Sequence, residues 1–175
     1  MRVDAEGTAN ALTRRSPLGQ GLGLVGWLAL TFIAAACGAI ASIAAPAFYA
    51  QLARPSWAPP AGVFGPVWST LYPLMAFAAW LVWRERGPRM RGVALTLYVA
   101  QLVVNALWSW LFFAWHRGAL AFVDVVVLLV LIVLTASAFL RVSRLAALLL
   151  VPYLAWVAFA TALTWAVWRA NPALL

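Results

Sequence analysis

The sequence predicts an all-α integral membrane protein built as a bundle of five transmembrane helices, and its composition is the first reason. Of its 175 residues, 66% are hydrophobic and only 9% are charged, and the mean hydropathy is +0.96. Because a soluble domain carries roughly 25% charged residues, this chain lacks the polar groups needed to cover a water-exposed surface. The second reason is that the apolar residues form five long segments, and the third is that most connections between the segments are short.

The five segments favour helices over barrel strands, because they are continuously apolar and do not alternate with polar residues. Each approaches or exceeds the ~20 residues that cross the hydrocarbon as a helix, at a rise of ~1.5 Å per residue. Their short connections, 84–91, 116–118 and 141–144, predict that neighbouring helices are antiparallel. The segments themselves are 22–43, 66–83, 92–115, 119–140 and 145–168.

The first segment, 22–43, also resembles a signal peptide, because Arg14 and Arg15 precede an apolar run that contains Ala-Ala-Cys ending at Cys37. The apolar run continues past Cys37 to Ile43, however, which argues against cleavage. A membrane helix is therefore the favoured interpretation, and a cleaved signal is the alternative. Small residues recur at every fourth position of the segment, which suits close packing against another helix; they are Ala34, Gly38 and Ser42.

The one long connection, 44–65, is expected to act as a lid, because long ordered loops are disproportionately functional. Prolines there and just beyond it argue against regular structure, since each lacks a backbone donor and fixes φ; they are Pro55, Pro59, Pro60 and Pro66. Trp57 and Phe64 are the aromatic side chains expected to close over a ligand. We divide the chain into an N-terminal polar segment (1–21), a membrane domain (22–171) and a C-terminal tail (172–175).

The third segment carries the sharpest arrangement of side chains. Gln101, Asn105, Trp108 and Phe112 recur at i, i+4, i+7 and i+11, so they share one face of a helix. Amides at membrane depth need partners, because lipid offers none. The sequence allows two roles for these amides, hydrogen bonding between helices and contact with a ligand.

A separate stripe of small residues predicts self-association, with packing inside the same chain as the alternative; it consists of Gly92, Thr96 and Ala100.

The fourth segment holds Asp124, the only acid within a span. Because a buried charge is costly, a functional role is the default hypothesis, and a hydrogen-bonded structural acid is the alternative; Arg117 is the nearest basic residue in sequence.

Pro73 and Pro152 lie inside the second and fifth segments and are expected to bend them. In the fifth segment, Trp156 and Ala160 are one turn apart and leave a slot for a flat ring.

The 12 basic residues are all arginines that lie between the apolar segments and form no continuous stripe, so nucleic acid is not an expected partner. Arginine is enriched on the cytoplasmic side of bacterial membrane proteins. Nine arginines lie on the same side of the membrane as the N-terminus and three on the opposite side, which predicts a cytoplasmic N-terminus. Cys37, the single cysteine, excludes an intrachain disulfide and a cysteine-built metal site. The nine are Arg2, Arg14, Arg15, Arg84, Arg86, Arg89, Arg91, Arg141 and Arg144; the three are Arg54, Arg117 and Arg169.

Four stretches, in order along the chain, resemble the TspO/MBR family of tryptophan-rich sensory proteins. They are RPSWAPP from Arg54, FGPVWSTLYPLM from Phe64, QLVVNALWSWLFF from Gln101 and PYLAWVAFATALTWAVWRAN from Pro152. The resemblance implies a five-helix membrane bundle, commonly a homodimer, that binds porphyrins, sterols and synthetic isoquinoline or benzodiazepine ligands. It also implies that Asn105 is a residue of the ligand pocket.

We therefore expect a membrane receptor or sensor that binds a tetrapyrrole, such as protoporphyrin IX or a haem-like molecule, inside the bundle. A porphyrin or sterol transporter is one alternative, and a light-dependent porphyrin-degrading enzyme is another. Sterol is expected to bind weakly, because Trp165 stands where the short cholesterol pattern needs tyrosine. The expected ligand-binding residues are Trp57, Trp68, Gln101, Asn105, Trp108, Phe112, Trp156 and Ala160.

Catalysis by the protein's own side chains is not expected. The chain has one histidine, His116, and shows no paired carboxylates, no nucleophile next to a base and no phosphate-binding motif. No catalytic residue, no metal site and no required cofactor is predicted. The expected partners are a planar hydrophobic ligand, the lipid bilayer and a second copy of the chain.

Overall fold

The computed structural model describes residues 16–85 and 90–175, and the regular structure of these residues is all helical. Five spans are long and apolar enough to cross a membrane, which confirms the predicted class, and the chain is an integral, multi-pass membrane protein. The spans are Pro17–Ala41, Ala61–Arg84, Met90–Ala114, Gly118–Leu140 and Arg144–Ala170. Five of the arginines used to predict the orientation lie outside the described residues: Arg2, Arg14, Arg15, Arg86 and Arg89.

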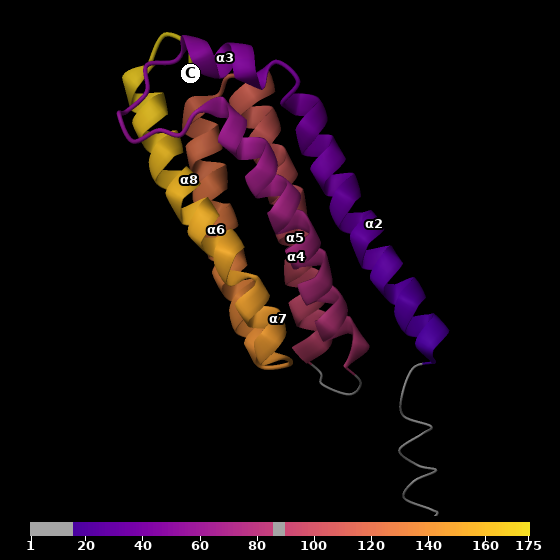
Figure 1. The fold of residues 1–175 in the computed structure, drawn as a ribbon. Coiled ribbons are helices and arrows are strands. Elements are labelled where there is room, and N and C mark those ends of the chain that lie inside the picture. The colour runs from indigo at the N-terminus through magenta and orange to yellow at the C-terminus, as the bar shows by residue number, and fades with distance from the viewer. Residues whose placement is uncertain (1–15, 86–89) are drawn as a thin grey trace, which may run out of the picture.

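The helices form one bundle in which a short helix, α3 (Ala45–Gln51), lies beside the C-terminus at one end (Figure 1). We call this the α3 end. Helix α5 packs closely against α6, and α6 packs against α8, while α2 packs against α4 and α5. The remaining helices are α2 (Pro17–Ala41), α4 (Phe64–Arg84), α5 (Met90–Ser109), α6 (Gly118–Leu140), α7 (Arg144–Leu149) and α8 (Val151–Ala170).

Helix α2 begins earlier than the apolar pattern predicts. Ser16 caps it by accepting a hydrogen bond from the Gly19 amide at 3.1 Å, and Pro17 occupies the first turn. A serine cap followed by proline is a strong start signal, because it satisfies a free amide and presets the helical φ. The helix then runs through Cys37 without a break.

The long loop is more regular than the prolines predict. Residues 45–51 form helix α3, with Pro46 in its first turn, and a 3₁₀ turn at Ala61–Val63 leads directly into α4. Pro66 lies in the first turn of α4, where the amide that proline lacks would have no helical partner. The prediction of an irregular segment is therefore wrong for 45–51 and at Pro66, and it holds for 53–60.

The two prolines predicted to bend the spans behave differently. Pro73 lies inside α4, which continues past it to Arg84. Pro152 instead lies in the first turn of α8, because the fifth span is divided at Leu150 into α7 and α8. Proline fits a first turn better than a helix interior, where it removes a hydrogen bond.

Helices α5 and α6 form an antiparallel pair joined by a tight turn. Residues Trp110–Ala114 widen into a π-helical turn, in which the Trp115 amide donates to the Trp110 carbonyl at 2.8 Å. His116 follows with a positive φ of 53°, and its ring stacks on Phe48 of α3 at 4.1 Å. The turn therefore carries an aromatic contact that seats α3 on the end of the bundle.

A single asparagine fastens the loop after α3 to the end of α8. The Asn171 side chain accepts a hydrogen bond from the Ala53 amide at 2.8 Å and donates to the Ala53 carbonyl at 2.9 Å. It also donates to the Val167 carbonyl at 2.7 Å, and the residue is buried. Segments 118 positions apart are thus held together by one side chain.

Replacing Asn171 by alanine removes all three hydrogen bonds, and we expect a loss of about 1–3 kcal/mol of stability, because buried backbone groups lose their partners. Hydrogen exchange in detergent should show a faster-exchanging Ala53 amide in Asn171→Ala. Thr161→Ala removes a side-chain hydrogen bond inside α8 only and serves as the matched control. An Ala53 amide as protected in Asn171→Ala as in the natural chain would contradict the role of this contact.

Candidate ligand-binding cavity

A cavity of about 460 Å³ lies near the α3 end, between α2, α4 and α5. One wall comes from α4 and α5 and is mostly aromatic; it includes Phe64, Trp68, Tyr72, Trp108 and Phe113. The facing wall comes from α2 and is built of small residues: Ala35, Gly38, Ala39 and Ser42. Residues of α3 and the loop close the end: Ala45, Pro46, Tyr49, Ala61 and Gly62.

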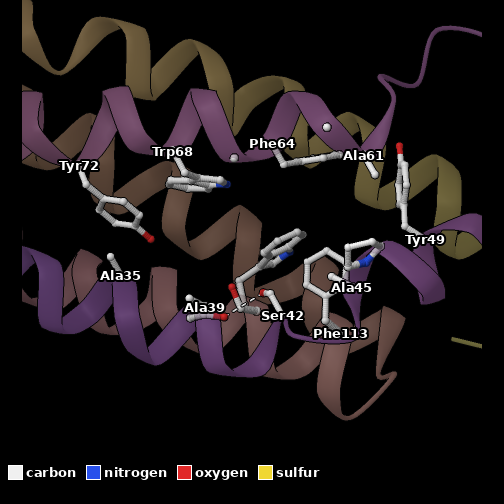
Figure 2. Close-up of a pocket in the computed structure, with 16 residues that line it drawn as sticks. Ala35, Ala39, Ser42, Ala45, Tyr49, Ala61, Phe64, Trp68, Tyr72 and Phe113 are labelled. Atoms are coloured by element: carbon white, nitrogen blue, oxygen red, sulfur yellow. Dashed lines mark hydrogen bonds between the residues drawn. The ribbon is translucent and has the colours of Figure 1, made fainter.

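The two walls lie opposite each other in Figure 2, with Phe64, Trp68 and Tyr72 facing Ala35, Ala39 and Ser42 across the cavity. Trp68 and Tyr72 are stacked, with ring centroids 5.2 Å apart. The side chains of α2 are too short to reach across, so a space remains that is bounded by aromatic faces on one side. None of the described lining residues is charged.

The cavity exists because α2 contacts different helices along its length. At the end where α2 begins, the Trp80 indole of α4 donates to the Gln20 carbonyl at 2.9 Å. Midway, Thr31 and Tyr98 of α5 share a hydrogen bond of 2.7 Å. Near the α3 end, Gly38 packs against α5, since a Cβ there would lie 3.2 Å from the Ser109 hydroxyl. Helix α2 therefore follows α5 and leaves room beside α4.

A chain of hydrogen bonds lies behind the aromatic wall and joins three helices. The Tyr72 hydroxyl donates to the side-chain oxygen Oδ1 of Asn105 at 2.9 Å, and the side-chain nitrogen Nδ2 of Asn105 donates to the Tyr153 hydroxyl at 3.3 Å. Tyr153 in turn donates to the Gln101 oxygen at 2.7 Å. Gln101 and Asn105 are both buried, so the structure places these amides in the interhelical bonding that the sequence left open.

Six of the predicted ligand-binding residues line two small voids beyond the cavity, and four of the six do not line the cavity itself. Asn105, Trp156 and Ala160 line one void of about 20 Å³, and Phe112 and Ala160 line another of about 20 Å³. Each has room for roughly one water molecule and not for an aromatic ring. Phe64 and Trp108 line both voids and the large cavity, and Trp68 lines the cavity and the first void, so these three side chains form a partition between the cavity and the voids.

The remaining predicted residues are distributed unevenly around the site. Trp68 and Trp108 line the open cavity, whereas Gln101 lies within the hydrogen-bond chain. Trp57 is 49% exposed and contacts Phe159 of α8 edge-on, with ring centroids 5.8 Å apart, so it does not line the cavity. Phe64, the other aromatic residue expected in the lid, does line it.

Sequence reasoning missed the wall that α2 contributes. Gly38 and Ser42 belong to the small-residue stripe that predicts helix packing, and Ala35 and Ala39 lie beside it. The stripe was a usable signal, because small residues that face a tryptophan-rich helix leave space as well as allow contact. The spacing of the small residues alone does not show whether they pack against another helix or leave a cavity beside it.

Three buried polar atoms in α5 and α6 have no hydrogen-bond partner among the described residues. They are the Trp108 indole nitrogen, the Gln101 amide nitrogen and one carboxylate oxygen of Asp124. Asp124 is only 8% exposed, whereas Arg117 is exposed. A buried polar atom without a partner is costly, so these three atoms mark the least satisfied part of the interior.

Tyr49 sets the electrostatics of the cavity's end. Its hydroxyl donates to the Pro59 carbonyl at 3.1 Å, and its ring contacts Phe64 edge-on at 5.5 Å. Burial raises the pKa of Tyr49, while the nearby Arg54 guanidinium acts in the opposite direction. The cavity as a whole is suited to binding an apolar, flat molecule rather than to acid–base chemistry.

Comparison with known proteins agrees with this architecture. The model of the TspO/MBR family matches residues 26–169, which include most of all five spans. The human translocator protein is 45% identical over 126 residues, covering 71% of this chain and 75% of the relative. Protein CrtK of Rhodobacter capsulatus is 40% identical over 150 residues, covering 82% and 92%. The tryptophan-rich protein TspO of Chlorobaculum tepidum is 41% identical over 129 residues, covering 71% and 80%. This chain therefore belongs to the TspO/MBR family.

Proposed function

We propose that this protein is a membrane receptor or sensor that binds a flat hydrophobic ligand of the tetrapyrrole class in the cavity between α2 and α4. The observation that carries the proposal is the shape of the cavity, with aromatic rings on one wall and small residues on the other. Its volume of about 460 Å³ lies within the ~300–1,000 Å³ common for small-molecule sites. A curated relative in Cereibacter sphaeroides, 40% identical, bears the name tryptophan-rich sensory protein, which supports a sensing role.

Binding in this cavity would combine burial of apolar surface with contacts between aromatic faces. Ring contacts add about 0.5–1.5 kcal/mol each beyond the area they bury, and Trp68 with Tyr72 already presents a stacked pair. The loop that closes the end loses little freedom on binding, because Asn171 and the prolines restrict it in advance. The site is thus largely preformed.

The inner residues Asn105, Trp156 and Ala160 remain proposed ligand contacts under one condition. Phe64, Trp68 and Trp108 separate the cavity from the void of about 20 Å³, so a ring that enters from the cavity reaches the inner residues only when one of these three side chains moves. Trp156 also lines a separate open groove between α4 and α8. A ligand that displaces the Trp108 indole would also give its unpartnered nitrogen an opportunity to bond. We therefore treat Trp68 and Trp108 as the primary contacts.

Filling the cavity from the α2 side tests the site. Ala35→Phe places a ring in the cavity and should weaken protoporphyrin IX binding about tenfold or more, as expected for ~1–3 kcal/mol of overpacking. Ala36→Phe is the matched control, since Ala36 is exposed on the same helix and does not line the cavity. Tryptophan-fluorescence titration of purified protein in detergent gives both affinities. Equal affinities of the two variants for protoporphyrin IX would show that the ligand binds outside this cavity.

Illumination separates a receptor from a light-dependent enzyme. Trp68 and Trp108 line the cavity, where an indole could donate an electron to an excited porphyrin, with the reactive chemistry supplied by the ligand. For a receptor, we expect illuminated protein with protoporphyrin IX to show no catalytic loss of porphyrin absorbance. Multiple turnovers that disappear in Trp68→Phe would instead establish the enzyme. Net porphyrin flux into proteoliposomes in the dark would establish the transporter.

The orientation is proposed on the charges at the two ends. Arg84, Arg91, Arg141 and Arg144 flank the ends of the helices remote from α3, whereas Arg54, Arg117 and Arg169 lie at the α3 end. An excess of arginine favours the cytoplasmic side, so the α3 end and the cavity are expected to face away from the cytoplasm.

A homodimer through α5 is the remaining part of the proposal. Gly92 and Thr96 are exposed, and nothing lies within 4 Å of where a Gly92 Cβ would be. The small-residue stripe thus faces outward and is open to a second copy, which favours self-association over packing inside the chain. Thr96→Leu combined with Ala100→Leu should shift the protein to monomer by light scattering in detergent. Val127→Leu, exposed on α6, should leave it dimeric; a dimer in both variants would exclude this face.

A further inference from the structure

Trp108 and Asp124 carry complementary polar atoms that lack partners. The Trp108 indole nitrogen is a hydrogen-bond donor, and the carboxyl group of Asp124 offers an acceptor oxygen; both atoms are buried without a partner among the described residues. Asp124 as a whole is only 8% exposed. Because hydrocarbon offers no replacement partner, both atoms are costly where they are. A donor and an acceptor that are each unsatisfied can satisfy each other if the structure brings them within reach.

Asp124 lies on the flank of α6 that faces α5. Phe122 occupies the opposite flank, since its ring contacts Trp165 and Trp168 of α8 with centroids 4.9 and 5.9 Å apart. Two residues correspond to ~200° around a helix, so Asp124 is directed away from α8. The long helix packed on that side of α6 is α5. Val125, the next residue, lines the same small void as Trp108, so the two helices are neighbours at this level.

The antiparallel register brings Trp108 and Asp124 toward a common level. The Arg117 amide donates to the Leu111 carbonyl at 2.8 Å and closes the turn between α5 and α6. Trp108 lies three residues before Leu111 and Asp124 seven residues after Arg117, an offset of ~6 Å at ~1.5 Å per residue. Side chains of a helix lean toward its N-terminus. In α5 this direction leads away from the turn and in α6 toward it, so the lean of both side chains reduces the offset.

The described position of the Trp108 ring depends on aromatic contacts. The ring stacks on Phe112 with centroids 5.3 Å apart and meets Phe113 edge-on at 5.6 Å. In this position it forms part of the partition between the cavity and the inner void. Turning the indole toward Asp124 exchanges a ring stack for a hydrogen bond, and these two contributions are of similar size. The two positions of the ring are therefore close in free energy.

We propose that Asp124 is the acceptor for a second position of the Trp108 indole, in which the ring nitrogen bonds to the carboxyl group and the partition opens. A flat ligand in the cavity favours this position, because the indole gains a partner as it leaves the cavity wall. Asp124 does not touch the ligand and acts as a positioning residue for Trp108. This inference rests on the proposed cavity-binding function and adds to it how a ligand reaches Asn105 and Trp156.

The first test observes the Trp108 indole directly by NMR. Isotope labelling of the indole nitrogens gives one N–H signal for each tryptophan, and the signal that disappears in Trp108→Phe belongs to Trp108. With protoporphyrin IX bound, the Trp108 signal of the natural chain should lie downfield of the same signal in Asp124→Leu. Without ligand the two signals should coincide. The ring current of the porphyrin acts in both liganded samples, so the difference between them reports the bond to Asp124.

The second test measures the affinity for protoporphyrin IX by fluorescence titration in detergent. Asp124→Leu should weaken binding about three- to tenfold, as expected for the loss of one hydrogen bond. Asp124→Asn keeps a carbonyl acceptor and should retain most of the affinity. In the Trp108→Phe background, Asp124→Leu should have no further effect, because the donor is already absent. An acid with a purely structural role would lower the affinity equally in both backgrounds.

Thr135→Val is the matched control, and it should bind as the natural chain does. It removes from the same helix a buried hydroxyl that donates to the Leu131 carbonyl at 2.7 Å. If Asp124→Leu does not give monodisperse protein, Asp124→Ala takes its place in both tests.

Two results would overturn the inference and leave the cavity in place. One is a Trp108 signal that is the same in the liganded natural chain and in liganded Asp124→Leu. The other is a loss of affinity in Asp124→Leu that persists in the Trp108→Phe background, which would assign Asp124 to the stability of the bundle or to the unpartnered Gln101 amide. Failure of the folded natural chain to bind protoporphyrin IX would instead remove the proposed function, and this inference with it.

Discussion

The buried hydrogen-bond chain from Tyr72 through Asn105 and Tyr153 to Gln101 is the interaction on which the rest of the bundle depends. In hydrocarbon there is little hydrophobic drive between helices, and polar groups find partners only in one another. The chain joins α4, α5 and α8 at bonds of 2.7 to 3.3 Å. Because both amides belong to α5, this helix becomes the reference against which α4 and α8 are placed, and the aromatic wall of the cavity is fixed with them.

Helix α2 is attached separately, and this difference creates the site. Its polar attachments are the Thr31–Tyr98 bond to α5 and the Trp80–Gln20 bond to α4, both away from the α3 end. Nearer that end its contact is close packing of Gly38 on α5. A wall of small residues that is not tied to α4 leaves space in front of Trp68. The cavity is thus a consequence of where α2 is fastened rather than of any single lining residue.

The sequence was sufficient for the fold because span length and continuous apolarity are imposed by the bilayer, whatever the tertiary contacts. Prediction from the sequence failed where the local backbone geometry determines the structure. Pro46, Pro66 and Pro152 all lie in first turns of helices, where proline is tolerated, and position within a helix cannot be read from composition. In the site, Trp68 and Trp108 line the cavity, and their contact with a ligand stays a prediction. The position of the α2 wall depends on the tilt of α2 relative to the other helices, and the outward position of Trp57 depends on the path of the loop. The hydrophobic periodicity of the sequence reports neither.

The partition formed by Phe64, Trp68 and Trp108 explains why some residues expected to bind ligand do not line the cavity. The open cavity lies on one side, and Asn105, Trp156 and Ala160 lie on the other, around a void of about 20 Å³. The three unpartnered polar atoms belong to Trp108 itself and to Gln101 and Asp124, all on α5 and α6. A well-satisfied interior resists rearrangement, whereas one with unpaired donors and an unpaired acceptor loses less when a side chain moves. Of these atoms, only the Trp108 indole nitrogen belongs to a side chain of the partition, whereas Tyr72 connects the hydrogen-bond chain to the wall of the cavity. Moving the Trp108 side chain therefore breaks no hydrogen bond of its indole nitrogen, although it separates the ring from its stacked neighbour Phe112.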